Sequence, residues 1–123
     1  MAKRAEPAGL THLRVTFSDK FYVGPGRADL LEGIAATGSI AAAGKAMGMS
    51  YKRAWSLVQA LNEGFGRPLV ETSRGGSEQG GAALTEDGAF VLERYRAMQE
   101  ATRKAIAPDV AAMAKKLDMS SRK

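Results

Sequence analysis

The chain has 123 residues, a length that suits one domain with its own hydrophobic core, and 45% of them are hydrophobic, as in folded rather than disordered proteins. Its 18 basic and 13 acidic residues give a net charge of +5, a basic balance that weakly favours a nucleic-acid partner. The lack of cysteine excludes disulfide bonds and thiolate metal sites, the single histidine leaves little for a catalytic triad or a zinc site, and no apolar run reaches the ~20 residues of a membrane span.

The first predicted element is a β-strand over residues 10–17. Leu13, Val15 and Phe17 alternate there with polar residues, and this period of two is typical of a half-buried strand. The alternation places His12 on the polar side of the strand. We therefore expect this histidine to face solvent.

Three helices are predicted after a strong turn signal, Gly24-Pro25-Gly26. Apolar residues at three- and four-residue spacing predict a first helix that ends at Gly38. Ser39 is placed to cap a second helix, IAAAGKAM, and Ser50 is placed to cap a third, YKRAWSLVQALNEGF. Two short helices that each follow a serine and are separated by Gly48-Met49 form a helix-turn-helix pattern.

A glycine-rich hairpin and a long helix complete the chain. Residues 69–85 are predicted to form two strands around the loop SRGGSEQGG, and such a hairpin after a helix-turn-helix is typical of a wing. A helix is expected over residues 85–107, with Pro108 breaking or restarting it. Residues 108–123 are expected to form a short basic tail with room for one more short helix.

The helix-turn-helix carries the main functional prediction, because its second helix can enter a DNA major groove and present donors to base edges. Arg53 suits either a guanine edge or a phosphate, and both options stay open. Either Ala54 or Trp55 faces the helix bundle, and for Trp55 we favour a core anchor over a stacking platform. The residues predicted to contact DNA are Ser39, Ser50, Tyr51, Lys52, Arg53, Ser56, Arg74, Gly75 and Gly76.

The long helix carries a seam of residues at alternating three- and four-residue steps, a short coiled-coil-like pattern. This seam packs either on its own domain or against a second copy of the chain. Because so long a helix extends beyond a small helical core, we favour a homodimer. The residues predicted for dimerisation are Val91, Tyr95, Met98 and Thr102.

Two alternatives compete with DNA binding. Winged helices also serve as protein-interaction modules, and here the basic face would bind an acidic partner. The glycine-rich loop is a weak candidate for a phosphate cradle, because it lacks the Gly-Lys-Ser/Thr ending of a P-loop. No pair of carboxylates is placed for acid–base chemistry, so we do not expect an enzyme, and we expect neither a metal nor a cofactor.

Residues 38–88 resemble the DNA-binding domain of the ModE-type molybdate-responsive transcription regulators. The resemblance is carried by SYKRAW at residues 50–55, by LVE before the hairpin, and by the spacing GG…GG-A-x-LT-x-x-G that ends at Gly88. It extends from about residue 10 to residue 106, and LysR-type regulators share the same general layout more distantly.

The resemblance implies a winged helix that dimerises through its first strand and long linker helix and binds partly palindromic operators. It places residues 74–81 in the wing, and it places in the recognition helix Ser50, Tyr51, Lys52, Arg53 and Ser56. Full-length members bind molybdate through additional C-terminal domains, which residues 108–123 cannot form. No residue of this chain is therefore assigned as a molybdate ligand, and the chain is either a natural single-domain member or a fragment.

The sequence thus predicts a mainly α fold with a small β component, a winged helix-turn-helix with a long C-terminal dimerisation helix. We expect a flexible N-terminus at residues 1–9 and one domain over residues 10–107. The expected function is that of a cytoplasmic, sequence-specific transcription regulator, a repressor that occupies a promoter. Its expected partners are double-stranded DNA and a second copy of the chain, with no membrane contact.

Overall fold

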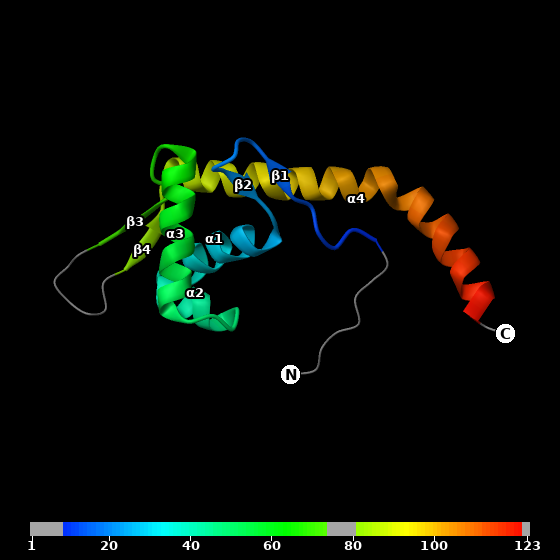
Figure 1. The fold of residues 1–123 in the computed structure, drawn as a ribbon, viewed down its shortest axis with the longest axis horizontal. Helices are drawn as coiled ribbons and strands as arrows, with labels where there is room; N and C mark the ends of the chain where they lie inside the picture. The colour runs from blue at the N-terminus through cyan, green and yellow to red at the C-terminus, as the bar shows by residue number, and fades with distance from the viewer. Residues whose placement is uncertain (1–8, 74–80, 122–123) are drawn as a thin grey trace.

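The computed structural model describes residues 9–73 and 81–121, and describes side chains as far as Leu117. Three short helices lie beneath a long fourth helix, and two small β-hairpins flank them (Figure 1). This arrangement confirms the predicted winged helix-turn-helix, mainly α with a small β component. In chain order the elements are β1 (Val15–Thr16), β2 (Tyr22–Val23), α1 (Pro25–Thr37), α2 (Ile40–Ala46), α3 (Tyr51–Phe65), β3 (Val70–Thr72), β4 (Ala82–Leu84) and α4 (Glu86–Ser121).

Each short helix has a defined start and stop in the sequence. α1 begins at Pro25, whose ring holds φ at a helical value, and it ends at Gly38, which has a φ of 72°. Ser39 and Ser50 cap α2 and α3, and Gly66 ends α3 with a φ of 92°. The serine and glycine signals therefore predicted α2, α3 and the end of α1. The helix α1 begins two residues earlier than the expected start at Arg27, so Pro25 and Gly26 of the predicted turn belong to the helix.

The hydrophobic core lies between α1, α3 and the first half of α4. Its fully buried members on the first two of these helices are Ala28, Leu30, Leu31, Ile34, Ala54, Val58 and Leu61. Gly44 of α2 allows α3 to approach closely, because a Cβ atom there would lie only 2.7 Å from the Cβ of Ala54. The helix-turn-helix is thus a tightly packed unit rather than two loosely joined helices.

The β3–β4 hairpin is attached to α3 through one amide side chain. The Asn62 Nδ2 group donates to the carbonyl of Val70 at 3.1 Å, and Asn62 Oδ1 accepts from the backbone N–H of Leu69 at 2.8 Å. The two strands pair antiparallel, with Val70 opposite Leu84. The base of the hairpin therefore holds a set position beside α3.

The first strand is much shorter than predicted. β1 is confined to two of the residues predicted over 10–17, and it pairs antiparallel with β2, with Val15 opposite Val23. Pairing stops there because the chain turns into α1 directly after Val23. Phe17, expected on the half-buried face, is 59% exposed, and its ring lies 5.6 Å from that of Phe21 across the turn. His12 is exposed, as expected.

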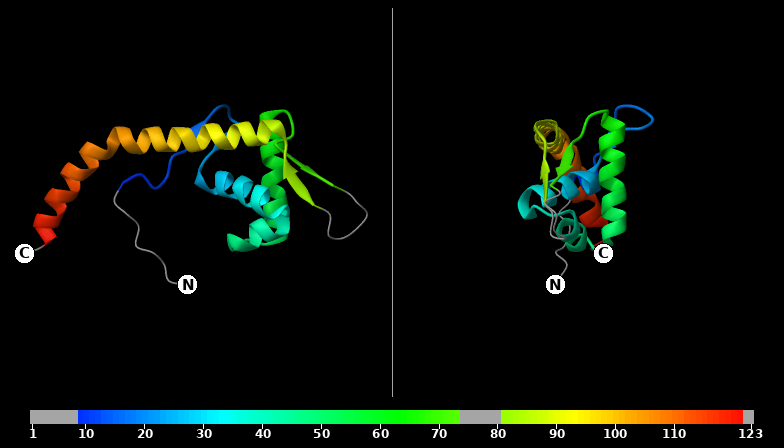
Figure 2. Two further views of the ribbon diagram at one scale, coloured as in Figure 1. Left: turned by 180° about the vertical axis from the view of Figure 1, so that it is seen from behind. Right: turned by 90° about the vertical axis from the view of Figure 1, so that its left-hand side faces the viewer.

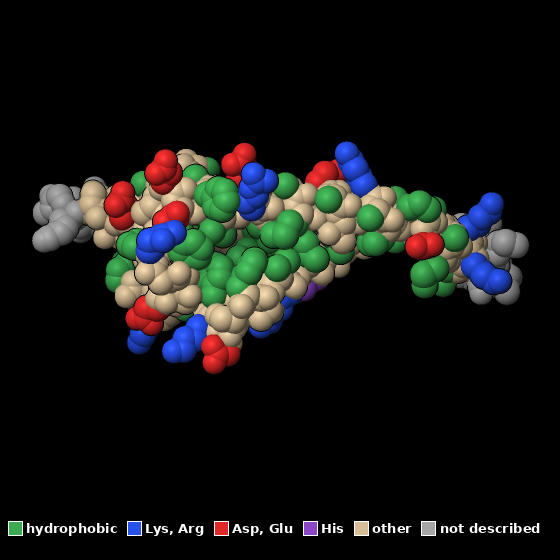
Figure 3. Space-filling view, turned by 90° about the horizontal axis from the view of Figure 1, so that it is seen from above, with side chains coloured by type: hydrophobic (Ala, Val, Ile, Leu, Met, Phe, Trp, Pro, Cys, Tyr) green, Lys and Arg blue, Asp and Glu red, His purple; other side chains and the backbone are tan. Residues whose placement is uncertain are grey.

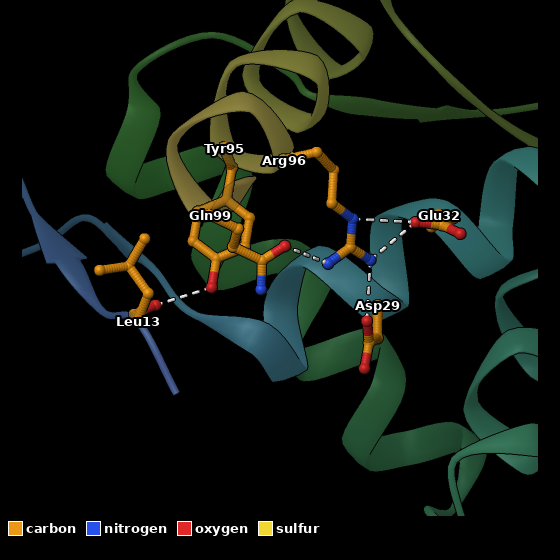
Figure 4. Close-up of polar contacts among 6 residues, drawn as sticks. All are labelled: Leu13, Asp29, Glu32, Tyr95, Arg96 and Gln99. Atoms are coloured by element: carbon orange, nitrogen blue, oxygen red, sulfur yellow. Dashed lines mark hydrogen bonds and ion pairs between the residues drawn. The ribbon is translucent and has the colours of Figure 1, made fainter. Parts of the chain in front are cut away.

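The helix α4 runs along α1 and continues well past it (Figures 1 and 2). The Tyr95 ring is fully buried, and its hydroxyl donates to the carbonyl of Leu13 at 2.7 Å. The next residue, Arg96, forms ion pairs with Asp29 at 2.8 Å and Glu32 at 2.7 Å on α1 (Figure 4). These contacts set the direction in which α4 leaves the body.

The prediction that α4 ends at residue 107 is wrong. The helix passes through Pro108 and continues to Ser121, so the predicted tail is helical over most of its length. Figures 1 and 2 show that α4 bends in its distal part. A proline removes one backbone donor and presses on the carbonyl four residues earlier, which bends a helix without ending it where the following residues favour helix, as the alanines here do.

Candidate DNA interface

The turn between α2 and α3 is held by backbone and serine contacts. Ser39 Oγ accepts from the N–H of Ala42 at 2.9 Å, and Ser50 Oγ accepts from the N–H of Arg53 at 3.1 Å. Between the helices, Gly48 takes a φ of 76°, a left-handed conformation that glycine adopts at little cost. Both serines are therefore N-caps, as predicted, and each satisfies one free N–H group at the start of its helix.

The helix α3 divides into a buried face and an exposed face. Ala54, Val58 and Leu61 are buried against the other helices. The predicted recognition residues on the same helix, with the cap before it, are all exposed: Ser50, Tyr51, Lys52, Arg53 and Ser56. The structure thus brings these predicted residues together on one solvent-facing surface.

Trp55 lies on this exposed surface and not in the core, so the favoured interpretation as a core anchor is wrong. Its side chain is 38% exposed, whereas Ala54 is fully buried. The close approach of Gly44 to Ala54 leaves space for a methyl group at this helix crossing but none for an indole. Gln59, four residues further along α3, is also exposed, and this spacing places it on the same flank of the helix as Trp55.

The basic side chains of α3 are available to a ligand. Within the described residues, the ion pairs involve Arg67, Arg96 and Arg103, and none involves Lys52 or Arg53. Lys45, in the last turn of α2, is exposed as well. A surface with unpaired cations beside hydroxyl donors suits a polyanion.

The predicted wing contacts cannot be placed. Arg74, Gly75 and Gly76 lie outside the described residues, and so does most of the loop over residues 74–81. The described base of the hairpin extends from the same end of the molecule as α3, away from the distal part of α4 (Figure 1). Its position beside α3 is that of a wing.

An apolar groove of about 450 Å³ lies on a different surface, between α3, α4 and the β1–β2 turn. Figure 3 shows hydrophobic side chains gathered in the hollow beside α4. Phe17 and Phe90 are 59% and 55% exposed at this groove. The apolar residues that form most of its wall are Phe17, Phe21, Phe65, Phe90, Val91 and Met98.

The predicted dimerisation residues have different environments. Val91 and Met98 line the groove and are partly exposed. Thr102 is partly exposed, and its hydroxyl donates to the carbonyl of Met98 at 2.7 Å. Tyr95 is fully buried in its own domain, so it is not a surface residue, and its assignment as a contact to a second copy is wrong. Burial raises the pKa of its phenol above the ordinary value.

The described part of the chain gives no sign of a metal site or a membrane span. Among the described side chains, in residues 9–73 and 81–117, no three acidic or histidine side chains are grouped in a way that suits a metal ion. None of the helices in these ranges has both the length and the apolar character that crossing a membrane requires.

Comparison with known proteins identifies bacterial helix-turn-helix regulators as relatives of this chain. The model of the family described as bacterial regulatory helix-turn-helix protein, lysR family, matches residues 27–89. The molybdenum-pterin-binding protein MopA of Rhodobacter capsulatus is 43% identical over 84 residues, which are 68% of this chain and 32% of MopA. The DNA-binding transcriptional dual regulator ModE of Escherichia coli K12 is 36% identical over 93 residues, which are 76% of this chain and 36% of ModE. The chain thus spans about a third of the length of these relatives, and the resemblance to ModE is confirmed.

A solved structure has the same fold. The crystal structure of the CbnR_DBD–DNA complex gives a TM-score of 0.57 at 27% sequence identity, and the match covers 72% of this chain and 95% of that chain. In that structure a chain of this fold is in complex with DNA. The relatives matched by sequence include proteins named as transcriptional regulators.

Proposed function

The chain belongs to the lysR family of bacterial regulatory helix-turn-helix proteins, and we propose that it binds operator DNA as a homodimer and represses transcription. The observation that carries this proposal is the exposed face of α3, where Lys52 and Arg53 have no ion-pair partner among the described residues. α3 enters the major groove, and the N-termini of α2 and α3 direct backbone N–H groups toward phosphates. The wing lies along the DNA backbone beside α3.

DNA binding is tested by fluorescence-anisotropy titration of a labelled duplex from upstream of the protein's own gene, at two or more salt concentrations. We expect the logarithm of the affinity to fall steeply with the logarithm of the salt concentration. Lys52→Ala should weaken binding and reduce that slope by about 1 if the lysine contacts a phosphate. Lys104→Ala removes the same charge from an exposed position on α4 and serves as the control with unchanged affinity.

Arg53→Ala distinguishes the two roles left open for this side chain. A loss of about 1–3 kcal/mol on the preferred duplex only identifies a base contact, whereas an equal loss on all duplexes identifies a phosphate contact. Weak binding by the unmodified protein that ignores both sequence and salt would contradict the proposed function and favour a module that binds an acidic protein.

The second copy is proposed to occupy the apolar groove between α4 and the β1–β2 turn. Phe17 and Phe90 expose more than half of their surface there, and partly exposed Val91 and Met98 continue the apolar strip along α4. Burying such a strip is favourable at roughly 25 cal/mol per Å², and a C2 pair buries it on both copies. The likeness to regulators that dimerise through their linker helix supports the same surface.

Light scattering coupled to gel filtration tests the dimer. We expect the mass of a dimer for the unmodified chain and a shift toward the monomer for Phe90→Lys, which places a charge in the groove. Tyr51→Ser removes an aromatic side chain of nearly equal exposure, 56% against 55%, from α3 and should leave the mass unchanged. A monomer at micromolar concentration, or a dimer unaffected by Phe90→Lys, would refute this assignment.

A role in the control of molybdenum-related genes is the final part of the proposal, and the names of the matched relatives support it. Because no residue of this chain is assigned as a molybdate ligand, we expect molybdate to leave the DNA affinity of this chain unchanged in the anisotropy assay. A molybdate-dependent affinity would contradict that expectation. Repression is tested with a reporter under the bound promoter, whose expression should rise when the chain is absent.

A further inference from the structure

Two aromatic side chains are exposed at the start of α3. The right-hand view of Figure 2 shows α3, in green, along one edge of the body. Tyr51 is 56% exposed and Trp55 38% exposed, and their stacked rings have centroids 6.5 Å apart and planes inclined by 20°. The two residues are four apart on one helix, so they lie on the same flank. Together they form a continuous apolar strip on the proposed recognition surface.

Packing within the chain leaves part of Trp55 and more than half of Tyr51 exposed. The inward position at this level of α3 belongs to Ala54, which is fully buried against Gly44 of α2. The other large exposed hydrophobic side chains of the described residues, Phe17, Phe90, Met113 and Leu117, lie after β1 or on α4. On α3 the aromatic pair instead stands among the exposed polar side chains of Lys52, Arg53 and Ser56.

The chemistry of the major groove identifies a group that such a strip would contact. An intact duplex hides the faces of its bases and presents their edges, and the one apolar group on those edges is the C5-methyl of thymine. A protein that stacks aromatic rings on bases needs unpaired strands instead. An exposed aromatic strip beside cationic and hydroxyl donors therefore matches a major-groove surface on which hydrogen-bonding groups of the bases lie next to thymine methyl groups.

We propose that Tyr51 and Trp55 contact thymine methyl groups and make the protein select thymine beside the positions that Lys52 and Arg53 contact. This inference rests on the proposed function and names the base that the site prefers. The ring separation of 6.5 Å is close to the ~6.8 Å that separates bases two steps apart on one strand. The strip is thus long enough to reach more than one thymine.

The test replaces thymine by deoxyuridine, which keeps every hydrogen-bonding group and removes only the methyl. The preferred duplex is first selected from a random duplex pool with the unmodified protein, and its thymines are then replaced one at a time. Affinities are measured by anisotropy of the labelled duplex. Burial of one methyl group is worth about a fourfold change in affinity, so we expect about a fourfold loss at each contacted thymine.

The variants assign that loss to the aromatic pair. Trp55→Ala and Tyr51→Ala should each bind thymine and uracil equally at the thymine that the removed ring contacts. Lys52→Ala should instead weaken binding to both duplexes and keep their ratio. Trp55→Leu is the second variant, because it retains apolar bulk and should keep part of the discrimination. Trp55 is the only tryptophan of the chain, so its fluorescence should also change when the unmodified protein binds the selected duplex.

Two results would overturn this inference and leave the proposed function standing. One is salt-sensitive binding of the selected duplex with no loss on uracil substitution at any position. The other is full discrimination retained by folded Trp55→Ala and by Tyr51→Ala. If the unmodified protein selects no duplex from the pool, the proposed function and this inference both fail.

Discussion

Tyr95 joins the long helix to the N-terminal segment through a single hydrogen bond, from its hydroxyl to the carbonyl of Leu13 at 2.7 Å. The ring is fully buried, so Tyr95→Phe keeps the packing and removes only the hydroxyl. The variant leaves the Leu13 carbonyl without this donor. We expect the free energy of unfolding to fall by about 1 kcal/mol, measured by urea denaturation.

The same residue predicts a pH dependence. Burial raises the pKa of the Tyr95 phenol above its ordinary value of 10.0, an effect that the charge of Arg96 partly offsets. As the pH rises past 10, the unfolded chain therefore loses this proton first, and the unfolded state binds fewer protons than the native state. Stability is thus lost above pH 10, and the loss should be steeper in the unmodified chain than in Tyr95→Phe. Equal slopes would show that the phenol does not titrate differently on folding.

Ala54 and Trp55, adjacent residues on α3, show which feature of the site the sequence alone could not predict. The spacing of apolar residues defined the buried face of α3 but did not decide between Ala54 and Trp55. The decision depends on a residue of another helix, because Gly44 approaches Ala54 so closely that only a small side chain fits between them. The prediction that Tyr95 contacts a second copy was wrong for a related reason. A seam at three- and four-residue spacing indicates which face of a helix packs, but not whether that face packs on its own chain or on another copy.

At the scale of an element, the start of α3 depends on the cap at Ser50, whose Oγ accepts from the N–H of Arg53. Ser50→Ala should lower the free energy of unfolding by about 1 kcal/mol, because the N–H of Arg53 at the helix start loses its side-chain partner. Ser56→Ala, an exposed serine inside the same helix, is the matched control and should change stability by less than about 0.5 kcal/mol. Thermal unfolding followed by circular dichroism compares the two, and equal melting temperatures would show that the cap is dispensable.

The ion pairs between α1 and α4 are a second feature at the scale of an element. Arg96 contacts Asp29 and Glu32, residues more than 60 positions away in sequence, whereas Arg103 and Glu100 pair within one helix. The side chains of Asp29 and Glu32 are 54% and 60% exposed, so each pair should contribute no more than about 1 kcal/mol. A double-mutant cycle on Arg96 and Glu32 should give a larger coupling free energy than one on Arg103 and Glu100. A coupling of zero would mean that the Arg96–Glu32 pair does not stabilise the contact between α1 and α4.

The elements that the sequence predicted well are those with local signals. Serine caps and left-handed glycines bound α1, α2 and α3, and these signals act within a few residues. The strand over residues 10–17 was overpredicted because its length depends on the two-residue partner strand β2. The extent of α4 was underpredicted because a proline inside a helix bends it where the flanking sequence still favours helix.

At the scale of the whole molecule, the two proposed surfaces lie on different parts of the fold. The exposed half of α3 and the base of the hairpin belong to one end, while the apolar groove follows α4 and the β1–β2 turn (Figures 1 and 3). DNA contacts and self-association are therefore separable by substitution. Lys52→Ala should weaken DNA binding without changing the mass of the protein in solution. Phe90→Lys should instead shift that mass toward the monomer.

This separation leads to a prediction about operator geometry. A two-fold dimer presents two copies of α3, which should read half-sites about one helical turn, ~10 base pairs, apart. Inserting five base pairs between the half-sites turns one of them to the opposite face of the duplex, so only one α3 can bind, and the affinity should fall sharply. Phe90→Lys, which we expect to be a monomer, binds one half-site at a time, and its weaker affinity should not respond to the insertion. Anisotropy titrations of both proteins on both duplexes decide the matter, because equal binding of the two duplexes by the unmodified chain would mean that its two α3 helices are not held in a common geometry.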